Sequence, residues 1–230
     1  MKLTRLRCGG GWRNRPKVLL TVLLTAATVP AAPPADFTIA RVHYGGGGDW
    51  YCDPSALPNL LDYLSAVTGI AVGEEAVVEP ADPELFDHPY LYLTGHGNVS
   101  FSALERERLR SYFAGGGFLH IDDNYGLDGY IRRELEALYP ELELVELPFE
   151  HPIYHCFYDF PSGPPKIHEH DGEPPQGYGL FLDGRLIVYY THECDLGDGW
   201  EDPAVHNDPP ELREAALRMG VNIIVYALTH

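Results

Sequence analysis

Apolar residues along the chain follow two spacings: every second position, as in a strand, and every third or fourth position, as in a helix. Residues 37–44 alternate and are rich in strand-forming side chains, and the four glycines at 45–48 end this run. Leucines then recur three and four positions apart over residues 54–68. That spacing predicts an amphipathic helix with Asp53 as its N-cap and Gly69 as its stop.

The same unit of strand, glycine loop and helix recurs in the next segment. Residues 90–94 form a short apolar run, residues 95–98 are a polar loop, and residues 102–114 have the composition of a helix. Ser102 and Glu105 have the spacing of a capping box, in which each side chain bonds the backbone of the other residue. The sequence therefore predicts a second strand followed by a second helix.

A strand, a helix and another strand are predicted next, at residues 118–121, 128–139 and 142–147. Strands that alternate with helices are typical of a mostly parallel sheet with helices on both faces. Residues 36–230 contain no linker, low-complexity tract or internal repeat. We therefore expect a single doubly wound α/β domain of the Rossmann-like kind over these residues.

The last third of the chain has a different pattern. Apolar runs at 178–182 and 186–191 flank Asp183-Gly184, a strong signal for a tight β-hairpin. Residues 211–228 carry an apolar stripe at helical spacing. The sequence thus predicts an added β-hairpin and a closing C-terminal helix.

The N-terminus has the three parts of a signal peptide. A basic stretch extends to Lys17, residues 18–29 are apolar, and small residues at Val29 and Ala31 suit cleavage after position 31. We therefore expect residues 1–31 to be a signal peptide and the protein to be exported to the periplasm or cell envelope. The alternative is a short N-terminal membrane anchor that is not cleaved.

Charge is distributed unevenly, because the first 35 residues hold six basic and no acidic residues. The remainder carries ten basic and 34 acidic residues, a formal net charge of −24 with histidine neutral. Such a body repels phosphate backbones and anionic lipid, so we expect neither nucleic-acid binding nor a membrane-embedded domain. Export would leave three cysteines, Cys52, Cys156 and Cys194, which allow at most one intramolecular disulfide.

In open α/β sheets, ligands bind beyond the carboxyl ends of the strands, and the loops at those positions are rich in polar and aromatic residues. Among these residues we expect catalytic roles for Asp122, Asp123 and His96. For ligand binding we expect contributions from Asp49, Trp50, Tyr51, Asn98, Asn124 and Trp200. The alternative for each residue is a purely structural role, such as capping a helix or turning the chain.

A second group of candidate residues lies at 168–170. In an extended segment His168 and His170 point to the same side, a spacing suitable for zinc or another imidazole-preferring metal. With Glu169 or a later carboxylate they would make three ligands for a divalent metal ion. The alternative is that these histidines are surface residues beside acids and hold no metal. The later acidic loop lacks the ordered pattern of a calcium-binding hand.

Five stretches together resemble the bacterial domain-of-unknown-function family 4159, namely residues 41–51, 92–98, 115–124, 166–174 and 195–202. The resemblance extends over essentially all of residues 37–230. It implies a Rossmann-like domain similar to class I glutamine amidotransferases. It also implies a setting in the cell envelope, where members of the family often occur. The family has no assigned activity, so the resemblance implies none.

Glutamine hydrolysis needs a thiolate on a sharp strand-to-helix turn, with a histidine base and an orienting acid nearby. The turn in this sequence offers Asp122, Asp123 and Asn124, and none of the cysteines is close to it along the chain. His192 and Glu193 are neighbours in a strand, so their side chains diverge. The sequence therefore argues against the usual amidotransferase mechanism.

Two functions remain. The first is a non-catalytic envelope protein that binds a small molecule, glycan or peptide fragment, or that serves as an accessory to other envelope proteins. The second is a hydrolase that acts on an envelope glycan or peptide, with Asp122 or Asp123 as general base and a metal ion held near His168 and His170.

Overall fold

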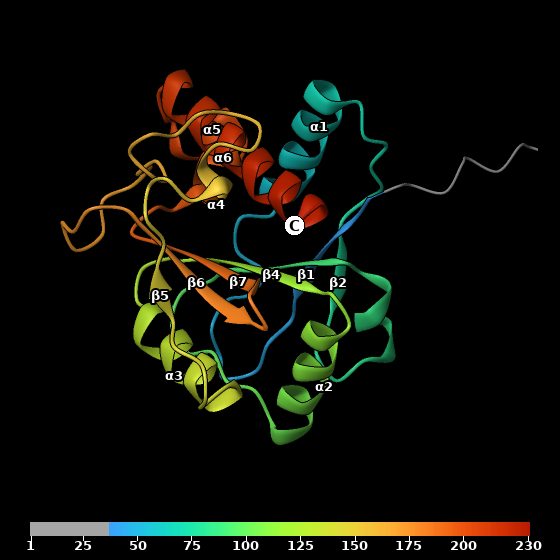
Figure 1. The fold of residues 1–230 in the computed structure, drawn as a ribbon. Helices are drawn as coiled ribbons and strands as arrows, with labels where there is room; N and C mark the ends of the chain where they lie inside the picture. Colours follow the sequence, from blue (N-terminus) through green and yellow to red (C-terminus); the bar gives the residue numbers. More distant parts are fainter. Residues whose placement is uncertain (1–36) are drawn as a thin grey trace, which may run out of the picture. The chain divides into compact units, whose positions relative to one another are not determined.

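The computed structural model describes residues 37–230, which pack around one mixed α/β sheet (Figure 1). The predicted signal peptide lies outside the described residues. The seven strands have the order β2-β1-β3-β4-β7-β6-β5. They are β1 (Ile39–Val42), β2 (Ala76–Val78), β3 (Tyr90–Leu93), β4 (Phe118–Asp122), β5 (Val145–Glu146), β6 (Gln176–Leu182) and β7 (Arg185–His192).

Most of the sheet is parallel, as the alternation of strands and helices predicts. The pairs β1–β2, β1–β3, β3–β4 and β4–β7 are parallel, and β6–β7 and β5–β6 are antiparallel. The hairpin β6–β7 is confirmed, and the turn residues Asp183 and Gly184 have φ angles of 51° and 82°. The hairpin joins the main sheet, because β7 pairs with β4. This strand is buried between β4 and β6.

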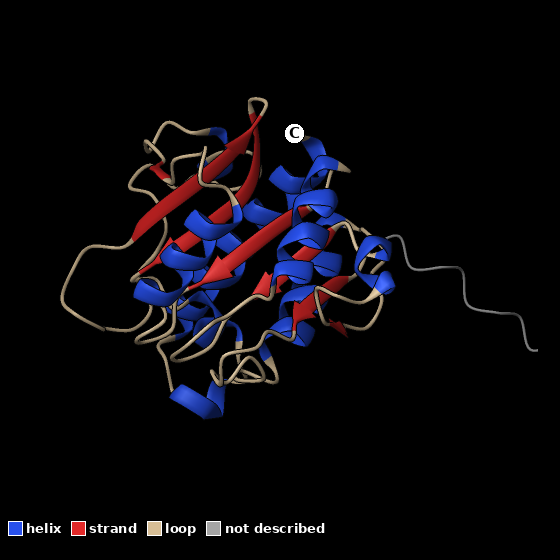
Figure 2. Cartoon of the chain, turned by 90° about the horizontal axis from the view of Figure 1, so that it is seen from below, coloured by secondary structure: helices blue, strands red, loops and turns tan. Residues whose placement is uncertain are grey.

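Helices cover both faces of the sheet (Figures 1 and 2). The helices are α1 (Ala56–Thr68), α2 (Ala103–Ala114), α3 (Asp128–Leu138), α4 (Leu196–Trp200), α5 (Pro203–His206) and α6 (Pro210–Thr229). Two short 3-10 helices, Pro83–Asp87 and Pro152–Tyr154, complete the described elements. Side chains of α1, α4 and α6 form one core, and side chains of α2 and α3 form the other.

The two cores follow from the alternation of side chains along each buried strand. In β3, Tyr90 and Tyr92 enter the core under α1 and α6, whereas Leu91 and Leu93 enter the core over α2 and α3. All four side chains are buried. A sheet that is buried on both faces explains why its central strands are nearly continuous apolar runs.

Several predicted helix ends are confirmed and one is wrong. Gly69 ends α1 in the left-handed conformation, and Ser102 and Glu105 form the capping box of α2. Asp53 is not the N-cap of α1, since that position is Ser55. Asp53 instead has a left-handed φ of 55°, and its side chain turns toward Cys52.

Strand β2 and helices α4 and α5 were not predicted. Each has three to five residues, too few for a hydrophobic period to become visible. The closing helix was predicted correctly. None of the helices in the described residues is long and apolar enough to cross a membrane.

Candidate functional site

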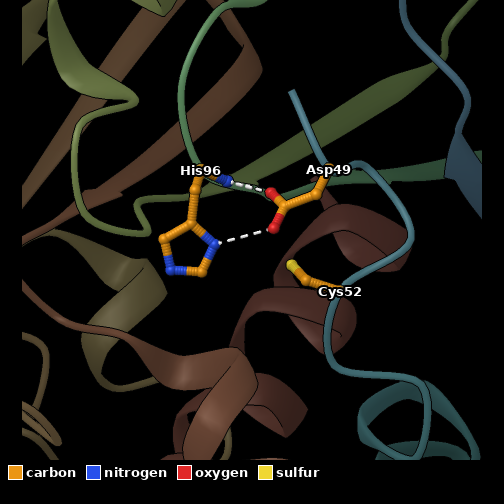
Figure 3. A group of neighbouring side chains, drawn as sticks. All are labelled: Asp49, Cys52 and His96. Atoms are coloured by element: carbon orange, nitrogen blue, oxygen red, sulfur yellow. Dashed lines mark hydrogen bonds and ion pairs between the residues drawn. The ribbon is translucent and has the colours of Figure 1, made fainter. Parts of the chain in front are cut away.

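The loops that follow β1 and β3 meet at the carboxyl edge of the sheet. The carboxylate of Asp49 accepts a hydrogen bond from the backbone N–H of His96, and its Oδ2 lies 3.1 Å from His96 Nδ1. Figure 3 shows both contacts, with the sulfur of Cys52 beside the same carboxylate. Asp49, Cys52 and His96 each present one ligating atom within 4.8 Å of the other two. Two residues singled out in the sequence therefore lie together, and Cys52 joins them.

The glycine run makes this approach of the two loops possible. A Cβ atom at Gly48 would lie 2.7 Å from the carbonyl oxygen of His96, and one at Gly46 would lie 2.8 Å from that of Asn98. Gly46 also has a φ of 106°, which L side chains rarely adopt. The backbone N–H of Gly48 donates to the Asn98 carbonyl at 3.0 Å. Larger residues at these positions would separate Asp49 from His96.

The loop after β4 joins the same group. Asn124 Nδ2 lies 3.3 Å from Cys52 Sγ and 3.4 Å from Asp53 Oδ2, and Cys52 Sγ lies 3.3 Å from the same oxygen of Asp53. Arg41 is buried and donates to the carbonyls of Cys52 and Asp53 at 2.7 and 3.1 Å. Arg41 therefore fixes the backbone on which the thiol and carboxylate stand. The loops after β1, β3 and β4 form one edge, as expected.

Asp122 is fully buried at this edge. Its two oxygens accept from the Thr191 hydroxyl and the Gly197 N–H, each at 2.6 Å. Burial raises its pKa well above the ordinary value, and Asp195 adds to this effect. The carboxylate of Asp122, for which the sequence predicts a catalytic role, links β4, β7 and α4 and does not face solvent in this structure.

Asp123 is also buried, but it differs from its neighbour because one of its carboxylate oxygens has no hydrogen-bond partner in the part of the chain that the structure describes. Its Oδ2 lies 3.6 Å from His192 Nε2, and its Oδ1 has no hydrogen-bond partner among residues 37–230. Burial raises the pKa of Asp123 from 3.8 to about 7, and the nearby Asp128 adds to the increase. A carboxyl group with such a pKa exchanges protons near neutrality, as a general base must.

The predicted ligand-binding residues have different positions. Tyr51 is 65% exposed, and Trp50 is half-buried and packs against His43 with ring centroids 4.2 Å apart and planes tilted by 32°. Asn98 forms hydrogen bonds with Gly46 and Arg133. Trp200 does not belong to this group. It is completely buried, and its indole N–H donates to the Ala216 carbonyl at 2.8 Å. Trp200 is therefore a core residue, because its ring fills the space between the sheet and α6.

His168 and His170 converge on one carboxylate, as their spacing suggested. Asp195 Oδ2 lies 3.4 Å from His168 Nδ1 and 2.9 Å from His170 Nε2. Glu169 does not join them, since its side chain is 70% exposed and pairs with Lys166 at 3.2 Å. The expected metal set of His168, Glu169 and His170 is therefore not assembled. Successive side chains of an extended segment point to opposite sides, so Glu169 points away from the side that His168 and His170 share.

Other acidic residues, Asp198 and Asp208, contact His168 where Glu169 does not. His168 Nδ1 lies 2.7 Å from Asp198 Oδ2, and His168 Nε2 lies 3.0 Å from Asp208 Oδ1. His206 Nε2 lies 3.5 Å from Asp198 Oδ1 and 3.1 Å from Glu201 Oε2. A hydrogen bond to Asp195 is the largest cause that raises the pKa of His168, to about 10. Burial raises the pKa of Asp198 to about 7. We call His168, Asp198 and His206 the histidine group.

Sequence reasoning missed several residues of this edge. Asp198 and His206 lie in loops that are visibly rich in acids and histidines, but no spacing links them to His168. The sequence did not predict a place for Arg41 or Cys52 in this site, because their positions depend on contacts between residues that are separate in the chain. Backbone strain identifies part of the same edge, since Asp53, Glu193 and Asp195 have φ angles of 55°, 57° and 58°.

Fold and site together define an α/β domain with polar and acidic residues gathered at the carboxyl edge of a mostly parallel sheet. The chain belongs to the family described as Domain of unknown function (DUF4159), whose model matches residues 38–228. The family resemblance of the five motifs is thereby confirmed. A comparison with curated proteins finds no match.

The raised pKa of Asp123 predicts a pH-dependent cost to folding. The folded protein holds a proton that the unfolded chain releases above its pKa of 3.8, so this group lowers stability as the pH rises from about 4 to about 7. The cost at pH 8 has an upper bound of about 4 kcal/mol. The variant Asp123→Asn should therefore be more stable than the wild type at pH 8 and nearly equal at pH 4.

Chemical denaturation of both proteins between pH 4 and pH 8 measures this difference. The exposed Asp87 serves as the control, and Asp87→Asn should change stability equally at both pH values. A stability difference between Asp123→Asn and the wild type that stays constant with pH would contradict the prediction.

Proposed function

We propose that this protein is an exported cell-envelope domain that binds a glycan at the carboxyl edge of its sheet. The observation that carries the proposal is a pair of exposed tyrosines, Tyr51 and Tyr125, with exposed fractions of 65% and 61%. Tyr51 directly precedes Cys52 in the chain, and Tyr125 directly follows Asn124. The side-chain nitrogen of Asn124 lies 3.3 Å from the sulfur of Cys52. The two rings are therefore held by loops that touch, at one edge of the molecule.

Exposed tyrosines suit a glycan ligand because a phenol ring has an apolar face and a polar tip. The apolar face packs on a sugar ring, and the hydroxyl remains available for hydrogen bonds. Asp49 and His96 are partly exposed beside Tyr51 and offer further acceptors and donors to sugar hydroxyls. Rigid aromatic residues beside a few polar groups are typical of ligand sites.

The charge of the domain narrows the class of glycan. Ten basic and 34 acidic residues after position 35 give a body that repels anions. The partly exposed carboxylate of Asp49 lies at the same edge as the tyrosines. A neutral or amino-bearing oligosaccharide is therefore favoured over an acidic one.

Oligosaccharide binding should depend on the two tyrosines. We expect the tetramer of N-acetylglucosamine to bind the wild type in isothermal titration calorimetry. Tyr51→Ala and Tyr125→Ala should each weaken this binding about two- to tenfold, since an aromatic contact contributes roughly 0.5–1.5 kcal/mol.

Phe86 provides the matched control, because it is exposed and belongs to the 3-10 helix that precedes β3, at the amino end of the sheet. Phe86→Ala should leave the affinity unchanged. Absence of heat with both the acetylated tetramer and its deacetylated form would refute glycan binding.

We further propose that the fold is a variant of the class I glutamine amidotransferase-like fold without its cysteine nucleophile. The mostly parallel sheet and the polar turn after β4 support this assignment. Cys52 does reach this turn in space, through Asn124. Burial raises the pKa of Cys52 far above its ordinary value, and Asp53 adds to the increase, so the thiol form is favoured over the reactive thiolate.

A hydrolase remains the second candidate, and the partnerless oxygen of Asp123 is the observation that favours it. With a pKa of about 7, Asp123 can take a proton from a water molecule that attacks a bound glycan. Asp122 is not required for this role, because both of its oxygens are engaged.

If the protein hydrolyses its glycan, Asp123→Asn should lower the rate by roughly two to four orders of magnitude and leave binding intact, as expected on loss of a general base. The wild-type rate should rise as the pH passes through about 7, where Asp123 loses its proton. Reducing-end release from the same tetramer measures the reaction. An equal rate in wild type and variant would exclude Asp123 as the base.

Export is proposed from the layout of residues 1–31. We expect the mature protein to begin at Ala32 and to accumulate in the periplasmic or envelope fraction. Mass spectrometry of the N-terminal peptide from each cell fraction tests this expectation. Native protein that begins at Met1 in the cytosol would contradict it, whereas an intact N-terminus in the membrane fraction would indicate an uncleaved anchor.

A further inference from the structure

The histidine group has the composition and geometry of a metal site. His168 comes from the loop at 166–171, Asp198 from α4 and His206 from α5. Each residue offers one ligating atom within 4.8 Å of the other two. Asp198 lies between the imidazoles, with Oδ2 at 2.7 Å from His168 and Oδ1 at 3.5 Å from His206. The centroids of the two imidazole rings are 5.0 Å apart, and their planes make an angle of 60°.

Two partnerless oxygens beside His168 give independent evidence for a missing cation. Asp195 Oδ1 and Asp208 Oδ2 are buried and have no hydrogen-bond partner within the described part of the chain. The side chains of these residues are only 5% and 9% exposed. Their other oxygens contact His168 at 3.4 and 3.0 Å. Both partnerless acceptors therefore lie at the histidine group.

A buried carboxylate oxygen without a donor is costly, and a cation is one of the few ways to satisfy it. Asp195, Asp198 and Asp208 all contact His168, and Glu201 contacts His206. Four carboxylates thus contact three imidazoles, because Asp195 also lies 2.9 Å from His170. A divalent ion held by neutral imidazoles would supply the positive charge that these histidines otherwise carry as protons, and it could also bind a partnerless oxygen.

We infer that His168, Asp198 and His206 bind a zinc ion, with a partnerless oxygen of Asp195 or Asp208 available as a fourth ligand. Two imidazoles and a carboxylate are a ligand set that zinc accepts, and imidazole disfavours magnesium and calcium. Ligand atoms around one tetrahedral zinc lie roughly 3.3 Å apart. The three residues therefore need only small movements to close on the ion.

The second group with ligating atoms, Asp49, Cys52 and His96, lacks such supporting evidence. None of its side-chain oxygens or nitrogens is among the buried partnerless atoms of residues 37–230. His96 is 53% exposed, and its Nδ1 already pairs with Asp49. Asp49, Cys52 and His96 are therefore the alternative zinc site that the experiments must distinguish from the proposed one.

Zinc binding is tested on the full chain after removal of metals with a chelator. Titration with zinc chloride in a calorimeter should give one site, and zinc should raise the melting temperature by several degrees. His168→Ala, His206→Gln and Asp198→Asn should each weaken zinc binding at least tenfold and abolish the rise in melting temperature. His206 lies on the exposed four-residue helix α5, so its variant tests the proposal even if His168→Ala does not fold.

The control for these variants is His155→Ala, which removes another histidine paired with an aspartate, Asp159. It should bind zinc like the wild type. Cobalt as a probe separates the two groups. The histidine group gives cobalt bands without sulfur-to-metal charge transfer, whereas Cys52 as a ligand would add it.

Three results would overturn the inference. The first is an equal melting temperature with zinc and with chelator. The second is zinc binding that is lost in Cys52→Ser or His96→Ala but kept in His206→Gln. The third is a sulfur-to-cobalt charge-transfer band in the wild type. The inference does not depend on glycan binding. Loss of affinity for the N-acetylglucosamine tetramer with intact zinc binding would affect the proposed function alone.

Discussion

The carboxyl edge of the sheet depends on the buried carboxylate of Asp122, which links strand β4 to strand β7 and helix α4. One oxygen accepts from Thr191 in β7, and the other accepts from the backbone of Gly197 in α4. Since α4 carries Asp198, this link sets where the histidine group can form. A Cβ at position 197 would lie 3.3 Å from Asp122 and 2.9 Å from Asp53, so glycine is needed for this close approach.

The edge concentrates more negative charge than its arginines and lysine can offset. Arg41 is buried there, where it donates to the carbonyls of Cys52 and Asp53 and pairs with Glu75 at 3.5 Å. Lys166 pairs with Glu193 at 2.9 Å. The other buried carboxylates depend on histidines, on protonation or on a cation. Burial raises the pKa of Asp122, Asp123 and Asp198, and a neighbouring carboxylate adds to the increase in each case.

The glycines and the exposed aromatic residues of the edge have complementary roles. Gly46 and Gly48 let the loops after β1 and β3 pack with their backbones in contact. This packing fixes Asp49 and leaves the ring of Tyr51 in solvent. Tyr125 is likewise exposed beside Asn124, which bonds inward. For the proposed glycan, tight backbone packing beneath the exposed rings would lower the entropic cost of ordering these loops on binding.

The sequence by itself determined the order of the main elements, the doubly wound architecture and the identity of the edge loops. These features depend on local periodicity, on caps such as Ser102 and Gly69, and on the rule that parallel strands end at one edge. It did not determine the short elements β2, α4 and α5. A segment of three to five residues forms through contacts with distant residues and has no period of its own.

Only the tertiary structure decided which polar residues of the edge are exposed, buried or paired. Asp122 and Asp123 are adjacent in the chain, yet one has both oxygens bonded in the core and the other keeps a partnerless oxygen. Trp200 is expected from the sequence to bind a ligand because it is an aromatic residue in a polar loop, but its side chain is completely buried in the core. His168 and His206 are 38 positions apart and meet through Asp198. Burial and pairing depend on contacts between segments far apart in sequence, and local spacing carries no record of them.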